Sequence, residues 1–180
     1  MKNVFIDTNV FLNFFKFQKE HLEKLKGIND LIIDGKIKLI LPQQVIDEFN
    51  RRRDKVLDQS FKSINNLPSI DKSSGALTEE KIRKVNEINN KIGKLKRELI
   101  KEAKLGNLPA DKVINKIFSN SEIISCDKEI LIQAKERIDR GNPPGKKSYY
   151  CDAIIWESLL VKFPDKDIYF IGKDDHYQSK

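Results

Sequence analysis

Three carboxylates stand where a strand pattern ends or a helix begins, and a fourth lies about two turns into a predicted helix. They are Asp7, Glu48, Asp152 and Asp174. Acids that gather in one place repel each other unless cations neutralise them. Oxygen ligands without an accompanying set of cysteines and histidines favour Mg²⁺ or Mn²⁺. If the fold brings these side chains together, they predict a divalent-metal site.

Each acid also has an ordinary structural explanation. Asp7 and Asp152 could be helix N-caps, Glu48 could be a solvated helix residue, and Asp174 could form a turn. A shared site is favoured by position, because three of the four acids follow an apolar strand or begin a helix. That places them at one expected edge of a sheet.

Short apolar runs alternate with helical patterns along the chain. The strand candidates are 4–6, 37–41 and 167–172, with a shorter extended piece at 123–124. Apolar residues at steps of three and four predict helices from about residue 18, from 43, over 78–105, from 127 and over 152–161. Thr78 and Asp127 are the expected N-caps of two of these helices. The alternation indicates an α/β domain with a mainly parallel central sheet.

The chain has an excess of positive charge. Its 180 residues include 34 Lys and Arg against 27 Asp and Glu, a formal net charge of +7. Such an excess suits a polyanion, above all nucleic acid, and a lysine-rich surface that only maintains solubility explains it equally well. Residues 81–104 hold nine basic residues and three glutamates, or 9 − 3 = +6.

Composition excludes several classes of protein. No stretch approaches the roughly 18 apolar residues of a membrane-spanning helix. The first residues lack the pattern of a secretion signal. Cys126 and Cys151 are too few for a disulfide framework or a zinc site, so a reducing, cytoplasmic setting is expected.

Four segments resemble the ordered motifs of PIN-domain nucleases. Residues 4–11 have the apolar strand that ends in Asp-Thr-Asn, and 41–49 have the glutamate that follows a proline-initiated helix start. Residues 150–157 resemble the third motif, in which an aspartate begins an apolar helix. Residues 169–174 resemble the fourth, a strand that runs into a turn with an aspartate, with Gly172 in place of the usual hydroxyl residue. The Pro-Pro-Gly-Lys-Lys approach to the third motif is similar to a bacterial PIN-like subgroup.

The resemblance implies a fold and an activity. The fold would be a three-layer α/β/α domain over 1–180 with a helical insertion at about 54–118, complete or as the N-terminal part of a longer protein. The activity would be metal-dependent hydrolysis of phosphodiester bonds, most often in single-stranded or structured RNA, with Mg²⁺ or Mn²⁺. Asp7, Glu48 and Asp152 would be the core catalytic and metal-binding group, with Asp174 as a fourth ligand acting partly through water.

Further residues could contact the nucleic acid. Asn9 could orient the first aspartate or a water, or it could be a simple turn residue. Arg51 and Arg53 lie about one turn beyond the glutamate, and Lys146 and Lys147 lie on the approach to the third motif. For these four the alternatives are phosphate contact and an ordinary solvated surface.

Other functions remain open at this stage. One is a catalytically silent PIN-like scaffold that binds RNA or protein, and another is a nuclease for DNA, including flap structures. A haloacid dehalogenase type of phosphotransferase is disfavoured, because Asn9 stands where that class needs a second acid. An antitoxin-like protein and a second copy of the chain are further partners that a toxin or defence role would allow.

Overall fold

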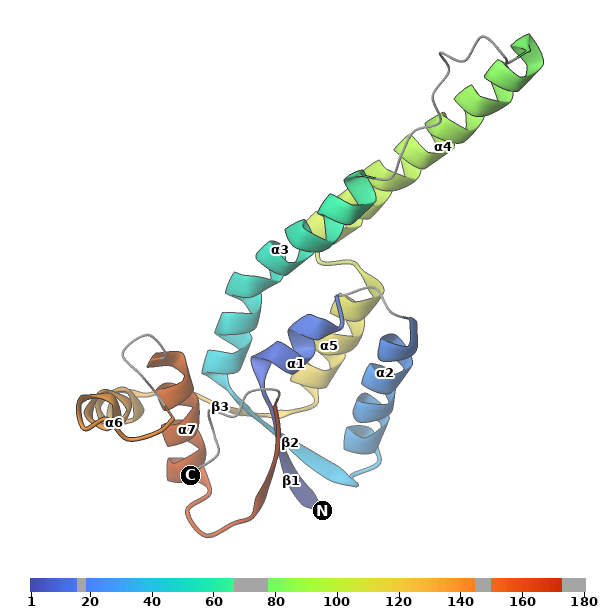
Figure 1. Cartoon of the computed structure of the whole chain (residues 1–180). Coiled ribbons are helices and arrows are strands. Elements are labelled where there is room, and N and C mark those ends of the chain that lie inside the picture. Colours follow the sequence, from blue (N-terminus) through green and yellow to red (C-terminus); the bar gives the residue numbers. More distant parts are fainter. Residues whose placement is uncertain (16–18, 67–77, 145–149, 173–180) are drawn as a thin grey trace.

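The computed structural model of the chain describes residues 1–15, 19–66, 78–144 and 150–172 (Figure 1). In chain order the elements are β1 (Lys2–Ile6), α1 (Thr8–Asn13), α2 (Lys19–Ile33), β2 (Ile37–Pro42), α3 (Gln43–Asn65), α4 (Glu79–Lys104), α5 (Pro109–Ser119), β3 (Glu122–Ile124), α6 (Lys128–Asp139), α7 (Tyr150–Lys162) and β4 (Ile168–Ile171). Across these ranges, none of the helices combines the length and apolarity that a membrane crossing requires.

The four strands form one parallel sheet in the order β3-β2-β1-β4. In the register of the central strand, Phe5 lies opposite Ile40 of β2 on one side and opposite Phe170 of β4 on the other. Helices α1, α2 and α5 lie on one side of the sheet, and α6 and α7 lie on the other (Figure 1). This is the expected three-layer α/β/α fold, and all four expected strands are present.

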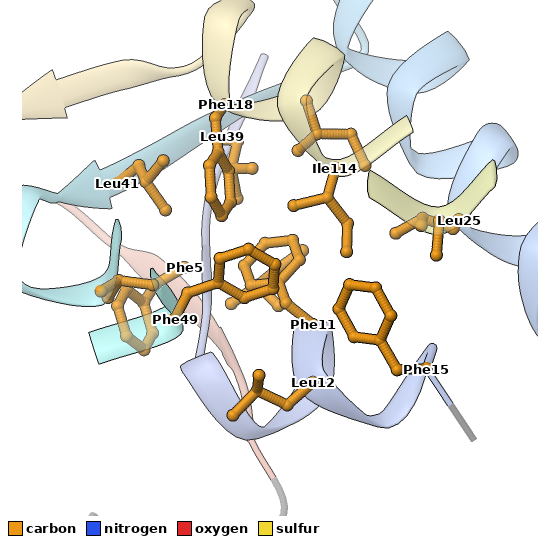
Figure 2. Packing of buried hydrophobic residues seen from close by; sticks show 14 of the residues in the cluster. Phe5, Phe11, Leu12, Phe15, Leu25, Leu39, Leu41, Phe49, Ile114 and Phe118 are labelled. Carbon is orange, nitrogen blue, oxygen red and sulfur yellow. The ribbon is translucent and has the colours of Figure 1, made fainter. Parts of the chain in front are cut away.

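Aromatic rings fill the core between the sheet and α1, α3 and α5 (Figure 2). The Phe118 ring meets the rings of Phe11 and Phe49 edge to face, with centroids 5.1 and 5.4 Å apart. Phe5 and Phe15 are also fully buried in this cluster. Edge-to-face contacts add to the free energy gained by burying each ring. The cluster fixes the start of α3 and the whole of α1 against the carboxyl end of β1.

Two predicted N-caps differ in outcome. Asp127 caps α6, since its carboxylate accepts a hydrogen bond from the Ile130 N–H at 2.9 Å. Thr78 occupies the N-cap position of α4, but its side chain makes no capping hydrogen bond.

Helix α5 was not among the expected elements. Its start carries an explicit signal, because Pro109 is the first helical residue and the Asp111 carboxylate accepts a hydrogen bond from the Leu108 N–H at 3.1 Å. Ile114 and Ile117 are fully buried, so α5 belongs to the core. The part that projects from the sheet is the outer half of α3 and most of α4 (Figure 1).

A buried ion pair fastens this projection to the core. Arg53 of α3 donates two hydrogen bonds, each of 2.7 Å, to the carboxylate of Asp111 on α5. It donates a third to the carbonyl of Ala103 at the end of α4. The side chain of Arg53 is 12% exposed and that of Asp111 is 4% exposed. The hydrogen bonds to Asp111 raise the pKa of Arg53 above its ordinary value.

This geometry corrects the expected role of Arg53. Its guanidinium is directed into the protein and joins three helices, so we do not retain it as a phosphate contact. Neighbouring positions on a helix differ by about 100°, which is why Arg51 and Arg53 have different surroundings.

Replacing Asp111 with alanine is expected to lower the free energy of unfolding by about 3 kcal/mol, because the Arg53 charge would remain buried with only the exposed Asp54 carboxylate, 3.1 Å away, as a partner. The double replacement Arg53→Met and Asp111→Leu should cost less, since no buried charge is left. Urea denaturation measures both changes.

The matched control is Glu136→Ala, which breaks the exposed pair between Glu136 and Arg140. It should cost no more than about 1 kcal/mol. Equal losses for Asp111→Ala and Glu136→Ala would contradict the structural role of the buried pair.

Candidate functional site

The strand order creates one position at which the chain changes direction across the sheet. From β1 the chain proceeds to β2 and β3 on one side, and then crosses to β4 on the other side of β1. In open parallel sheets ligands bind at this switch point, beyond the carboxyl ends of the strands. Here those ends belong to β1 and β4.

Asp7 lies at this switch point. It is the first residue after β1, and its N–H donates a 2.9 Å hydrogen bond to the carbonyl of Ile171, the last residue of β4. A Cβ atom added to Gly172 would lie 3.6 Å from the Asp7 Cβ. The pairing of β1 with β4 therefore sets the position of Asp7.

Asp7 occupies the N-cap position of α1 but does not cap it with its side chain. Instead the Asn9 amide donates a 3.2 Å hydrogen bond to Oδ2 of Asp7. The aspartate is only 4% exposed. The ordinary N-cap explanation thus does not account for this carboxylate. Of the two alternatives expected for Asn9, the hydrogen bond agrees with the one in which Asn9 orients the first aspartate.

Glu48 is brought to Asp7 by the residue between Asp7 and Asn9. Thr8 is fully buried, and its hydroxyl donates a 3.0 Å hydrogen bond to Oε2 of Glu48. The other carboxylate oxygen of Glu48 accepts a 2.7 Å hydrogen bond from Arg52, one turn along α3. The Glu48 side chain is 16% exposed, so it is a partly buried acid with a positioned partner on each oxygen.

The start of α7 meets α3 at the same place. An Arg51 Nη atom lies 3.8 Å from Sγ of Cys151, within the distance of a weak hydrogen bond to sulfur. The pKa of Cys151 is raised, first because burial disfavours the thiolate and next because the Glu48 carboxylate lies nearby. Asp152 follows directly in the first turn of α7 and is half-buried.

The structure thus places three of the four predicted acids around one region. Asp7 and Glu48 are linked through Thr8. Asp152 follows Cys151, whose pKa is raised in part by the nearby charge of Glu48. Asp174, Lys146 and Lys147 lie outside the described residues. Within the described ranges, no three His, Cys, Asp or Glu side chains lie close enough together to form a ready-made metal site.

The donor chemistry nevertheless suits a hard cation. Carboxylate oxygens from Asp7, Glu48 and Asp152 are the ligands that Mg²⁺ and Mn²⁺ prefer. Both Glu48 oxygens are engaged by protein donors, so a cation would have to compete with Arg52 for this carboxylate.

Thr8 and Arg52 are site residues that sequence reasoning missed. Arg52 lies four residues after Glu48, the spacing at which opposite charges meet on a helix, so that pair could have been expected. Thr8 offered a weaker signal, since its neighbours Asp7 and Asn9 were already candidates. Its bond to Glu48 joins residues 40 positions apart and depends on tertiary packing.

Comparison with known protein families identifies a match over most of the chain. A family model described as PIN domain matches residues 4–177, nearly the whole chain. No curated protein and no solved structure matches the chain significantly. PIN-domain proteins are in general nucleases that use divalent metal ions. The switch-point acids and the extent of this match agree, and the chain belongs to the PIN domain family.

Proposed function

We propose that this protein is a nuclease that cleaves RNA with the help of Mg²⁺ or Mn²⁺. The observation that carries the proposal is the link from buried Asp7, through Thr8, to Glu48 at the switch point of the sheet. Asp152 completes the described acids, and Asp174 is proposed as a fourth from the sequence motif.

Asp7, Glu48 and Asp152 would hold the cation. When bound, Mg²⁺ or Mn²⁺ lowers the pKa of an attacking water and neutralises charge on the scissile phosphate. Asn9 keeps the Asp7 carboxylate in one orientation. Thr8 does the same for Glu48 and acts as a positioning residue.

Two arginines beside the acids have separate tasks in this proposal. Arg52 neutralises Glu48 before a cation arrives. Arg51 is exposed and lies between α3 and the start of α7, where its guanidinium could contact a phosphate of the substrate. Lys146 and Lys147 are proposed as further phosphate contacts on the basis of the sequence.

RNA is proposed as the substrate in preference to DNA. The support is the family's usual substrate together with a net charge of +7 that favours a polyanion. A nuclease for DNA or flap structures would use the same acids. A silent scaffold would keep the fold and lack metal-dependent cleavage.

Replacing Asp7 with asparagine is expected to reduce Mn²⁺-dependent cleavage of a single-stranded RNA by more than about 10²-fold, the scale seen when an active site loses one electrostatic group. The same change should raise the Tm in EDTA, because it removes one of several mutually repelling charges. A gain of about 1 kcal/mol corresponds to about 2–4 °C in a chain of this size.

Asp127→Asn is the matched control, since it makes the same substitution at another helix N-cap, where asparagine caps equally well. It should change neither cleavage nor Tm. Equal cleavage by the Asp7→Asn variant and wild type would overturn the proposed role of Asp7. A wild-type protein that cleaves no RNA in Mn²⁺ would favour the silent scaffold.

Replacing Arg52 with alanine is expected to tighten Mn²⁺ binding, because the cation would no longer compete with a guanidinium for Glu48. We expect a Kd about tenfold lower, which is about 1.4 kcal/mol. This is within the range of about 1–4 kcal/mol for two charges 4 Å apart near a protein surface. Isothermal titration calorimetry measures the change.

Arg140→Ala removes the same charge from an exposed pair of the same helical spacing, Arg140 with Glu136. It should leave the Kd for Mn²⁺ unchanged. Weaker or unchanged binding by the Arg52→Ala variant would show that Glu48 is not a ligand in competition with Arg52.

A further inference from the structure

The long helix α4 carries a basic face that the proposed chemistry does not use. Each residue of a helix advances about 100° around its axis. From Arg83 onward, one sector of about 60° holds four cations, one asparagine and no acid, while Glu79 in the first turn of the helix lies in line with it. We call it the basic face, and it consists of Arg83, Asn90, Lys94, Arg97 and Lys101.

The adjoining sector of equal width has a different composition. It holds two lysines and three glutamates, namely Lys84, Lys91, Glu87, Glu98 and Glu102. Its net charge is 2 − 3 = −1, against +4 for the basic face. Charge is therefore uneven around α4: four of its nine Lys and Arg residues share the basic face, whereas the adjoining sector has a net negative charge.

The basic face is open to solvent. All five of its residues are exposed. Within the described ranges none of its four cations forms a salt bridge, whereas Lys84 of the adjoining sector pairs with Glu80 at 2.7 Å. Arg97 lies back along the helix over Gly93, with Nη1 3.6 Å from the place a Cβ would occupy there.

Helix α3 lies against a different side of α4. Ile100 and Ala103 of α4 line a groove of about 290 Å³ together with Leu57 and Phe61 of α3. The outer part of α4 continues beyond the last described residue of α3 (Figure 1). The basic face is thus presented along the outside of the projection.

The face lies in line with the acids. Helix α3 begins beside the site, and Leu57 lies nine residues beyond Glu48, or about 14 Å along its axis. At that level α4 passes α3, close to Lys101. The basic face extends from there to Arg83, a further 27 Å or so. It therefore spans distances of about 15 to 40 Å from Glu48.

We propose that the basic face of α4 is a second contact for an RNA strand, which it holds at a distance from the cleavage site. This inference rests on the proposed function, because it takes the same RNA to be bound at both places. A nucleic acid strand in a duplex carries one charge per about 3.4 Å, so about 12 phosphates separate the acids from the far end of the face. Short RNA reaches only one of the two contacts.

The test measures RNA binding by fluorescence anisotropy in EDTA, which prevents cleavage, over a series of NaCl concentrations. The probes are labelled single-stranded RNAs of 24 and 6 nucleotides. Replacing Lys94 and Lys101 with glutamine should lower the slope of log affinity against log salt for the longer RNA by about 1.4, or 0.7 for each lost phosphate contact.

The matched control replaces Lys84 and Lys91 with glutamine, which removes the same charge at the same seven-residue spacing from the adjoining sector. It should leave both slopes as in the wild type. Equal slopes for the two double variants with the longer RNA would overturn the proposal.

Failure of the proposed function would be distinguishable. Wild-type protein that cleaves neither RNA in Mn²⁺ would contradict the nuclease, while the slopes in EDTA would still report on the basic face. If both proposals hold, the Lys94→Gln, Lys101→Gln variant cleaves the shorter RNA at the wild-type rate.

Discussion

Hydrogen bonding of β1 on both of its edges is the constraint on which the rest of the site depends. Because β2 and β4 pair with opposite edges of this strand, its carboxyl end becomes the point where the chain order of the sheet reverses. Asp7 follows β1 there, tied by its N–H to the end of β4. A buried carboxylate at that point needs partners, and Asn9 supplies one of them.

Buried and partly buried charges on α3 also have partners of opposite charge. Glu48 is balanced by Arg52, and Arg53 is balanced by Asp111 in the core. Arg52 and Arg53 are adjacent in sequence but point in different directions around α3. Arg52 therefore contacts a residue of the candidate site, and Arg53 contacts a residue of the core. By fixing α3 relative to α4 and α5, the Arg53 pair also fixes the direction in which the basic face leaves the acids.

Much of this arrangement could be predicted from local sequence signals. Apolar runs identified all four strands, and Asp127 identified the start of α6, because both signals act over a few residues. Helix α5 was not predicted, although Pro109 and Asp111 are typical of the first turn of a helix. The burial of Arg53 could not be predicted, since its partner is 58 residues away and three consecutive arginines look alike in sequence.

We infer that Asp7 and Glu48 bind one divalent cation. An anomalous difference map from crystals grown with saturating Mn²⁺ would detect this cation directly. We expect a manganese peak with oxygens of Asp7 and Glu48 within about 2.0–2.6 Å, the ligand distances of hard divalent cations, and with Arg52 withdrawn from Glu48. A map without manganese at these carboxylates, and with Glu48 still bound to Thr8 and Arg52, would contradict it.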